Sequence, residues 1–449
     1  MSEAQSQPVA RSDIVFAEKD QALKADVRRL GRLVGQVVKD QGGEALFDLV
    51  EAARRAAIAH REGNSDATPE LQSLIRELAP ETAGDFIRAF STYFQMVNMA
   101  EKVHRIRRRR AYLQDSRTPQ PYGALDTLMR LKEQGFGRDE IQQALARVEL
   151  TPIFTSHSIS VTRRTLLRKE QSIAQYLVKT LDPYLTPQEM TATLGRIRLE
   201  MTTGWQTDDH TQNPGLGDEA EHILFFLTDV LYRVIPYFYE VLETALEAAY
   251  GEDSRRIRVP ILVRFGTWAG GDMDGHPEIT GRSIRKSLHR NRTLVLNLYF
   301  AEVHELARHL SQTESRVEFS GELRERIAVY SSHFPESVHT VPPRHRGMPY
   351  RVFLRLVEAR LSATYDDAAF PYESPDEFVA DLECIAASLR AHRGQHAGLF
   401  ALNRLLRRAR TFGFHMATLD IRQRADVHSR VVAEGLAESK WDEFTSARA

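Results

Sequence analysis

The stretch Val259-Pro-Ile-Leu-Val-Arg-Phe-Gly-Thr-Trp268, followed at once by Ala269-Gly-Gly-Asp-Met-Asp-Gly-His-Pro277, decides the fold class. Its first part is apolar and β-prone and lacks the helical period, so it predicts a buried strand. Its second part is polar and rich in glycine, which predicts a loop after that strand. A strand that ends in polar residues is typical of β/α barrels, whose active sites lie at the carboxyl ends of the strands.

Two more segments break the helical period and also end in polar residues: Thr151-Pro-Ile-Phe-Thr-Ser-His157 and Phe412-Gly-Phe-His-Met-Ala-Thr-Leu-Asp-Ile-Arg422. Side chains alternate between the two faces of an extended strand. One face of each segment therefore carries a set of three residues: Ile153, Thr155 and His157 in the first, and Thr418, Asp420 and Arg422 in the second. Three strands do not close a barrel, which needs roughly eight, so the sequence predicts an incomplete one.

Most of the remaining chain carries the period of amphipathic helices. The predicted helices span about 23–37, 44–62, 83–112, 124–148, 163–181, 219–249, 284–311 and 349–365. Gly42-Gly43 follows the first of them and predicts a left-handed stop. The predicted fold class is therefore predominantly α-helical with a few parallel strands, as an incomplete TIM-type β/α barrel wrapped by many helices. We expect a disordered tail over residues 1–20 and one helical/barrel domain over 21–449.

The composition limits the function classes. The chain has 449 residues, with 60 lysines and arginines against 61 aspartates and glutamates. This balance argues against a general attraction to nucleic acid or anionic membrane, so any anion site is local. Cys384 is the only cysteine, which excludes an internal disulfide and a cysteine-clustered zinc site. Residues 1–19 lack the apolar core of a signal peptide, and charges and Pro236 interrupt the most apolar stretch, 223–250. We expect a cytoplasmic protein with no membrane partner.

Residues 105–110 carry five arginines in six positions. On a helix these arginines cover most of the circumference, so they cannot all face one ligand. The run is open to three interpretations: a solvated, ion-paired helix end, a site for a phosphorylated ligand or another subunit, and a nucleic-acid surface. The near-zero total charge weighs against the last of these.

Five stretches follow one another along nearly the whole chain and resemble the phosphoenolpyruvate carboxylase family in order and spacing. They are Leu30-Gly-Arg-Leu-Val-Gly with Gln41-Gly-Gly-Glu-Ala-Leu-Phe-Asp-Leu-Val50; Tyr93-Phe-Gln-Met-Val-Asn-Met-Ala-Glu101 with His104-Arg-Ile-Arg-Arg-Arg-Arg110; Phe154-Thr-Ser-His-Ser-Ile-Ser-Val-Thr-Arg-Arg-Thr165; Trp205-Gln-Thr-Asp208 with Asp218-Glu-Ala220 and Phe265-Gly-Thr-Trp-Ala-Gly-Gly-Asp-Met-Asp-Gly-His-Pro277; and Leu419-Asp-Ile-Arg-Gln423.

The resemblance implies a carbon-carbon lyase that forms oxaloacetate and phosphate from phosphoenolpyruvate and bicarbonate, and so replenishes the tricarboxylic acid cycle. In this reaction bicarbonate attacks the phosphate, which gives carboxyphosphate and the enolate of pyruvate, and the enolate then captures carbon dioxide. The resemblance also implies Mg2+ or Mn2+ as the cofactor, and a homotetramer, for the complete enzyme. Nucleic acid is not an expected partner.

Two residues have central roles by this resemblance. His157 matches the histidine of the family's Thr-Ala-His-Pro-Thr-Glu signature and is expected to deprotonate or hold carboxyphosphate, which suits an imidazole that titrates near neutral pH. Arg422 is expected to bind the substrate through its rigid guanidinium fork. The residues themselves leave two alternatives open: a structural histidine at 157, and an ion pair of Arg422 with Asp420 or another carboxylate.

Four further residues are expected to support the site: Arg163, Arg164, Asp272 and Asp274. The arginines are the pair that trails the signature. The aspartates lie in the glycine-rich loop, where paired glycines allow close backbone approach and a carboxylate can orient neighbours or cap a helix. Alternating aspartates before a glycine faintly resemble a calcium loop, but the closing glutamate and other ligands are missing. We expect no metal ligand in this chain.

Two departures from the family pattern bear on activity. The signature here continues with Ser158, Ile159 and Ser160 instead of proline, threonine and glutamate, which predicts a looser and less basic site for His157. His276 stands where the family has asparagine. The chain ends at Ala449, near the middle of the family's length and before its metal-binding carboxylates and other phosphate-binding arginines. We therefore expect the amino-terminal portion of a carboxylase, inert alone; the alternative is a non-catalytic helical protein that binds a partner or a phosphorylated metabolite.

Overall fold

A computed structural model describes residues 18–63, 67–114, 119–155, 162–208, 215–274, 276 and 278–438. The predicted tail lies outside the described residues except for Glu18–Asp20, which form a short 3-10 helix, η2. The chain divides into two compact units, whereas one domain is predicted over 21–449. We call Met1–Pro121 with Thr162–Gln212 the amino-terminal unit, and Tyr122–Val161 with Asn213–Ala449 the sheet unit.

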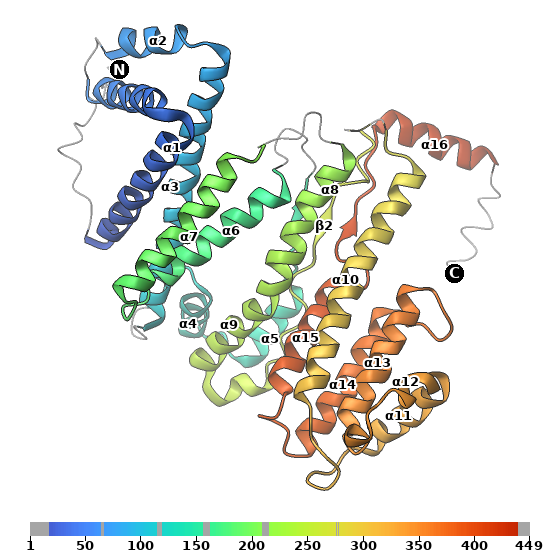
Figure 1. Cartoon of the computed structure of the whole chain (residues 1–449). Helices are drawn as coiled ribbons and strands as arrows, with labels where there is room; N and C mark the ends of the chain where they lie inside the picture. The colour runs from blue at the N-terminus through green and yellow to red at the C-terminus, as the bar shows by residue number, and fades with distance from the viewer. Residues whose placement is uncertain are drawn as a thin grey trace. The chain divides into compact units, whose positions relative to one another are not determined.

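The described part of the amino-terminal unit is helical (Figure 1). Its helices are α1 (Gln21–Arg61), α2 (Ala67–Arg76), α3 (Pro80–Gln114), α6 (Arg164–Lys179) and α7 (Pro187–Trp205). Apolar residues at helical spacing form the core of this unit, among them Leu30, Val34 and Val37 of α1, Met96, Met99 and Val103 of α3, Ile173 and Leu177 of α6, and Ile197 and Met201 of α7. The predicted apolar stripe of residues 23–37 is thus confirmed as a core-facing surface.

The break predicted at the paired glycines is present inside α1. Gly43 has φ +82° and ψ 174°, values outside the helical region, so α1 consists of two helical segments joined at this residue. Glycine adopts this conformation because it has no Cβ to clash with the backbone. The apolar stripes on either side, predicted separately over 23–37 and 44–62, belong to these two segments.

The sheet unit holds the remaining elements, and most are helices (Figure 1). They are α4 (Ala124–Glu133), α5 (Arg138–Arg147), α8 (Leu216–Phe225), η4 (Phe226–Leu231), α9 (Tyr232–Tyr250), η5 (Gly251–Arg256), α10 (Gly281–His309), α11 (Gly321–His333), α12 (Pro335–His339), η6 (Pro343–His345), α13 (Pro349–Tyr365), α14 (Pro375–Ala391), α15 (Leu399–Phe412) and α16 (Ala425–Glu438). Fully buried aromatic side chains lie in its core, among them Tyr299, Phe353, Phe378 and Phe412.

Two predicted helices are divided in the structure. The one over 124–148 is α4 and α5, because Gly135 takes a left-handed φ of +90° directly after α4. The one over 219–249 is α8, the π-helix η4 and α9, with Pro236 inside α9. Proline has no backbone N–H, so the carbonyl of Tyr232 loses its helical partner. Nε of Arg408 donates to that carbonyl at 2.8 Å instead.

The three segments predicted as strands form one parallel sheet in the order β1-β2-β3. The strands are β1 (Ile153–Phe154), β2 (Gly266–Thr267) and β3 (Thr418–Leu419). Ile153 pairs with Gly266, which pairs with Thr418, and the next residue of each strand pairs in the same way. The predicted class, predominantly helical with a few parallel strands, is confirmed, and the arrangement is consistent with part of a β/α barrel.

The close backbone approach predicted for the paired glycines is also present, directly after β2. A Cβ on Gly271 would overlap with the carbonyl oxygen of Asp420, which follows β3. Gly270 has φ +86°, and a Cβ there would overlap with the hydroxyl of Ser287 in α10. Because glycine has no side chain, the loop after β2 can lie this close to the end of β3 and to α10.

We expect Gly271→Ala to lower the free energy of unfolding by about 1–3 kcal/mol, because the added methyl must push the two strand ends apart. Urea denaturation followed by circular dichroism measures this loss. Gly217→Ala, in the first turn of α8, is the matched control, since a Cβ there meets nothing within 4 Å. Equal unfolding midpoints for the two variants would contradict the account of Gly271.

Candidate functional site

The carboxyl edge of the sheet brings together residues that lie far apart in the sequence. Asp272 follows β2 and Arg422 follows β3, and the two form a parallel β-bridge. The backbone N–H of Arg422 donates to the carbonyl of Gly271 at 2.9 Å, and the carbonyl of Arg422 accepts the N–H of Met273 at 2.9 Å. The sheet pairing therefore continues past the strands and aligns the side chains of the two predicted site residues.

The guanidinium of Arg422 is held in two ways. Its Nη1 donates to Oδ2 of Asp272 at 3.0 Å, and its central carbon lies 3.8 Å from the ring centroid of Trp268. Trp268 is held in turn, because its indole N–H donates to Oδ2 of Asp420 at 3.2 Å. The ion pair left open by the sequence is therefore formed with Asp272, while Asp420 contacts the arginine only through the tryptophan.

This arrangement suits an anion-binding arginine. The Asp272 side chain is 9% exposed, whereas the Arg422 side chain is 39% exposed. Among the described residues, Asp272 is the one hydrogen-bond acceptor that meets the Arg422 side chain. A guanidinium carries five N–H donors, so most of them remain available to a ligand. Phosphate and carboxylate groups match this donor geometry.

A second acidic side chain lies buried near the glycine-rich loop. The Glu219 side chain, on α8, is 2% exposed, and its Oε1 lies 2.9 Å from Nε2 of His276. The backbone N–H of His276 donates to the carbonyl of Asp272 at 3.0 Å. The imidazole thus links α8 to the loop that carries Asp272, and it supplies a polar partner for a carboxylate that water barely reaches.

The other predicted site residues are placed as follows. His157 lies outside the described residues. Asp274 is exposed in the turn after Asp272. Arg163 precedes the first residue of α6 and lies 4.0 Å from Asp208, a distance at the limit of an ion pair. Arg163 and Arg164 belong to the amino-terminal unit, whereas Asp272, Asp274 and Arg422 belong to the sheet unit.

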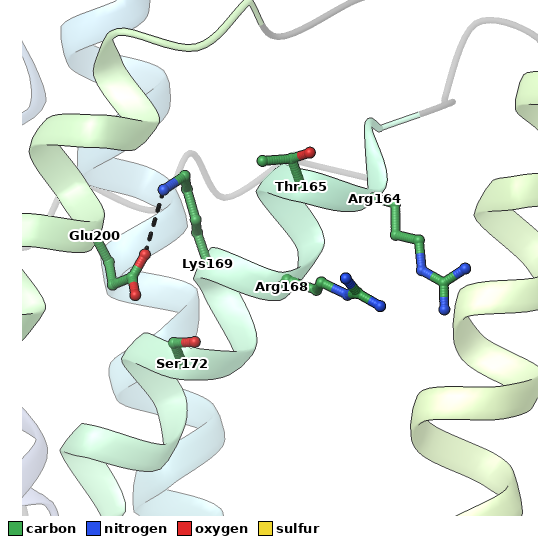
Figure 2. A pocket seen from close by; sticks show the side chains of 6 residues that line it. All are labelled: Arg164, Thr165, Arg168, Lys169, Ser172 and Glu200. Carbon is green, nitrogen blue, oxygen red and sulfur yellow. Dashed lines mark hydrogen bonds and ion pairs between the residues drawn. The ribbon is translucent and has the colours of Figure 1, made fainter.

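Arg164 lines a pocket of about 340 Å³ along α6 (Figure 2). The lining residues are Arg164, Thr165, Arg168, Lys169, Ser172 and Glu200. Nζ of Lys169 donates a hydrogen bond to Oγ1 of Thr203 at 2.6 Å and lies 3.4 Å from Oε2 of Glu200. Arg168 is exposed and forms no ion pair with a described residue. With three cations against one carboxylate at the start of a helix, the pocket favours an anion.

The arginine run of residues 105–110 lies near the end of α3, and part of it is ion-paired. Arg107 donates to Asp26 of α1 at 2.6 Å, and Arg108 lies 4.0 Å from Asp20. For these two arginines the structure supports the ion-paired helix end among the three interpretations. Arg105 and Arg110 are exposed.

Sequence reasoning missed two residues of the sheet edge. The pattern predicts Trp268 only as the end of a strand, although an aromatic residue just before a glycine-rich loop at a strand end is a usable signal. Glu219 was part of a family motif, but an acid in an amphipathic helix is normally solvated. Glu219 is buried because α8 packs against the loop after β2, and no local sequence pattern predicts that contact.

The described residues do not fit a metal site. No group of three or more histidine, cysteine, aspartate or glutamate side chains suited to a metal ion occurs among them. Asp272 is paired with Arg422, and Glu219 with His276. Within the same described ranges, no helix combines the length and the apolar character that a bilayer crossing requires.

Fold and site together define a helical β/α protein with an arginine presented at the carboxyl edge of a parallel sheet. A family model described as phosphoenolpyruvate carboxylase matches residues 23–446. The chain belongs to the phosphoenolpyruvate carboxylase family.

Curated relatives agree with this assignment. A phosphoenolpyruvate carboxylase of Xanthomonas oryzae pv. oryzae (strain MAFF 311018) is 46% identical over 441 residues, which cover 98% of this chain and 48% of that protein. One of Ralstonia nicotianae (strain ATCC BAA-1114 / GMI1000) is 33% identical over 436 residues, 94% of this chain and 44% of that protein. The chain spans about half the length of the curated relatives it matches.

We expect His276→Ala to destabilise the sheet unit by about 1–3 kcal/mol, because buried Glu219 loses a hydrogen-bond partner. His276→Asn keeps a side-chain donor and is expected to cost less. Thermal and urea unfolding of the two variants measure the difference. An alanine variant as stable as the wild type would show that the imidazole contributes nothing to the stability of buried Glu219.

Proposed function

We propose that this chain forms part of a phosphoenolpyruvate carboxylase, which makes oxaloacetate and phosphate from phosphoenolpyruvate and bicarbonate. One observation carries the proposal: the strand register aligns Phe154, Thr267 and Leu419 at one edge of a parallel sheet. Phe154 ends the strand that leads to His157, and Leu419 ends the strand that leads to Arg422. The two segments expected to carry the chemistry therefore leave the sheet at the same edge, which is where β/α enzymes bind substrates.

In the proposed reaction the two side chains have different tasks. Arg422 binds an oxyanion of phosphoenolpyruvate, since its guanidinium is presented at the sheet edge and keeps unused donors. His157 holds or deprotonates carboxyphosphate after bicarbonate has attacked the phosphate. A placed acid or base of this kind contributes roughly a hundredfold to ten-thousandfold in rate.

The remaining properties of the family are proposals for the complete enzyme. They are Mg2+ or Mn2+ as the cofactor, a homotetrameric assembly, a cytoplasmic location and a role in replenishing the tricarboxylic acid cycle. The divalent ion stabilises negative charge that develops on the substrate. The described residues of this chain provide no cluster to hold it.

We expect the purified chain to form no oxaloacetate above background with Mg2+, bicarbonate and phosphoenolpyruvate, because it spans about half of its relatives. A coupled assay for oxaloacetate measures this. Turnover that a His157→Ala variant abolishes would contradict the expectation and would support catalysis by this chain itself.

Sequencing the reading frame separates the carboxylase hypothesis from that of a binding protein. Continuation into the family's later carboxylates supports the carboxylase, and a genuine stop without a complementing half supports a binding protein.

The pocket on α6 favours a second candidate function, a non-catalytic protein that binds a phosphorylated metabolite. Arg164, Arg168 and Ser172 recur at four-residue spacing, so they share one face of α6. Figure 2 shows the guanidinium groups of Arg164 and Arg168 on the same side of the helix, away from the Lys169–Glu200 pair. Two guanidinium groups and a hydroxyl are well suited to a phosphate group.

We expect Arg168→Glu to weaken the binding of inorganic phosphate about tenfold or more, because a charged hydrogen-bond donor becomes a repelling carboxylate. Isothermal titration of the full chain at low ionic strength measures the affinity. Lys179→Glu is the matched control: it makes the same kind of charge change on α6 but does not line the pocket. Equal loss in both variants would show that only the general charge of the helix attracts phosphate.

A further inference from the structure

We infer that Asp272 and Trp268 are positioning residues that select which edge of the Arg422 guanidinium meets the substrate. Asp272 occupies Nη1, and the indole of Trp268 covers one face. The edge formed by Nε and Nη2 is thereby left for two oxygens of one phosphate or carboxylate group. This inference rests on the proposed function, in which Arg422 binds an oxyanion of phosphoenolpyruvate.

The tether to Asp272 is built into the backbone. Arg422 and Asp272 are bridge partners, and backbone hydrogen bonds on both sides of Arg422, to Gly271 and from Met273, are each 2.9 Å long. The two side chains therefore start from neighbouring, fixed Cα positions. Asp272 is 6% exposed, so an ionised carboxylate at this position needs strong partners. The charged hydrogen bond to Nη1, 3.0 Å long, is accordingly costly to give up to a ligand.

The indole of Trp268 restricts the guanidinium in a second direction. The backbone N–H of Trp268 donates to Phe154 of β1 at 2.9 Å, and its indole N–H donates to Asp420 at 3.2 Å. With both ends held, the ring is a rigid surface, and the guanidinium carbon lies 3.8 Å from its centroid. Stacking of this kind is attractive and also prevents an oxyanion from approaching that face.

The geometry of the guanidinium then determines how a ligand binds. Its donors form two edges that can each meet a pair of oxygens: Nε with Nη2, and Nη1 with Nη2. Asp272 takes up Nη1, which impairs the second edge. Among the described residues no acceptor meets Nε or Nη2, so the first edge remains complete. A two-point contact fixes the rotation of the bound group as well as its position.

The test uses the full chain labelled with 15N-arginine and follows the guanidinium signals of Arg422, which are identified by their absence in Arg422→Lys. In the wild type, the ring current of Trp268 should displace the Nε–H signal, and the tether to Asp272 should slow rotation of the Nη groups. Trp268→Leu should abolish the displacement, and Trp268→Phe should retain part of it. Asp272→Asn should restore fast rotation. The signals of Arg424, which is exposed and paired with Asp426 at 3.0 Å, should not change.

Ligand additions complete the test. Inorganic phosphate and pyruvate separate the phosphate end of the substrate from its carboxylate end. We expect one of them, and phosphoenolpyruvate, to shift Nε–H and Nη2–H of Arg422 but not Nη1–H, and Trp268→Leu to weaken that binding about fivefold. A ligand-induced shift of the Nη1–H signal would overturn the inference. So would Trp268 and Asp272 variants whose Arg422 signals and affinity equal those of the wild type. In either case Arg422 would remain a substrate ligand. If none of the three anions affects any Arg422 signal, the proposed function itself fails.

Discussion

The hydrogen bonding between three two-residue strands is the constraint on which the candidate site depends. Each strand comes from a different part of the chain, and each is followed by polar residues. Parallel pairing places their carboxyl ends at one edge, and the pairing continues through the bridge between Asp272 and Arg422. Strands this short gain little from pairing alone, so the helices that cover them must hold the sheet together. The large aromatic core of the sheet unit has this role.

Two carboxylates at the sheet edge are buried, and burying a charge costs free energy unless the charge is paired. Asp272 and Glu219 are both nearly inaccessible to water, and each has a basic or imidazole partner on another segment. A buried carboxylate without such a partner would be strongly destabilising. The pairings therefore stabilise the loop after β2, and Arg422 is the more exposed member of its pair.

Sequence reasoning worked best where the physical signal is local. The loss of the helical period marked the three strands, paired glycines marked the kink in α1 and the close contact at Gly271, and the apolar stripe of residues 23–37 marked a core face. It failed where a local turn residue was not recognised and where distant contacts decide. The predicted helix over 124–148 is two helices because Gly135 adopts a left-handed φ. Pro236 is tolerated inside α9 because Arg408, far along the chain, satisfies a carbonyl.

By itself the sequence determined the helical class, the positions of the strands and membership of a family, since these depend on periodicity, turn chemistry and the order of motifs. It also identified Arg422 and Asp272 as separate candidates. Only the tertiary structure decided that the two are partners, that Trp268 lies against the guanidinium, and that Glu219 is buried. The physical reason is that such contacts join residues from different segments, and their geometry depends on strand register and helix packing rather than on any local pattern.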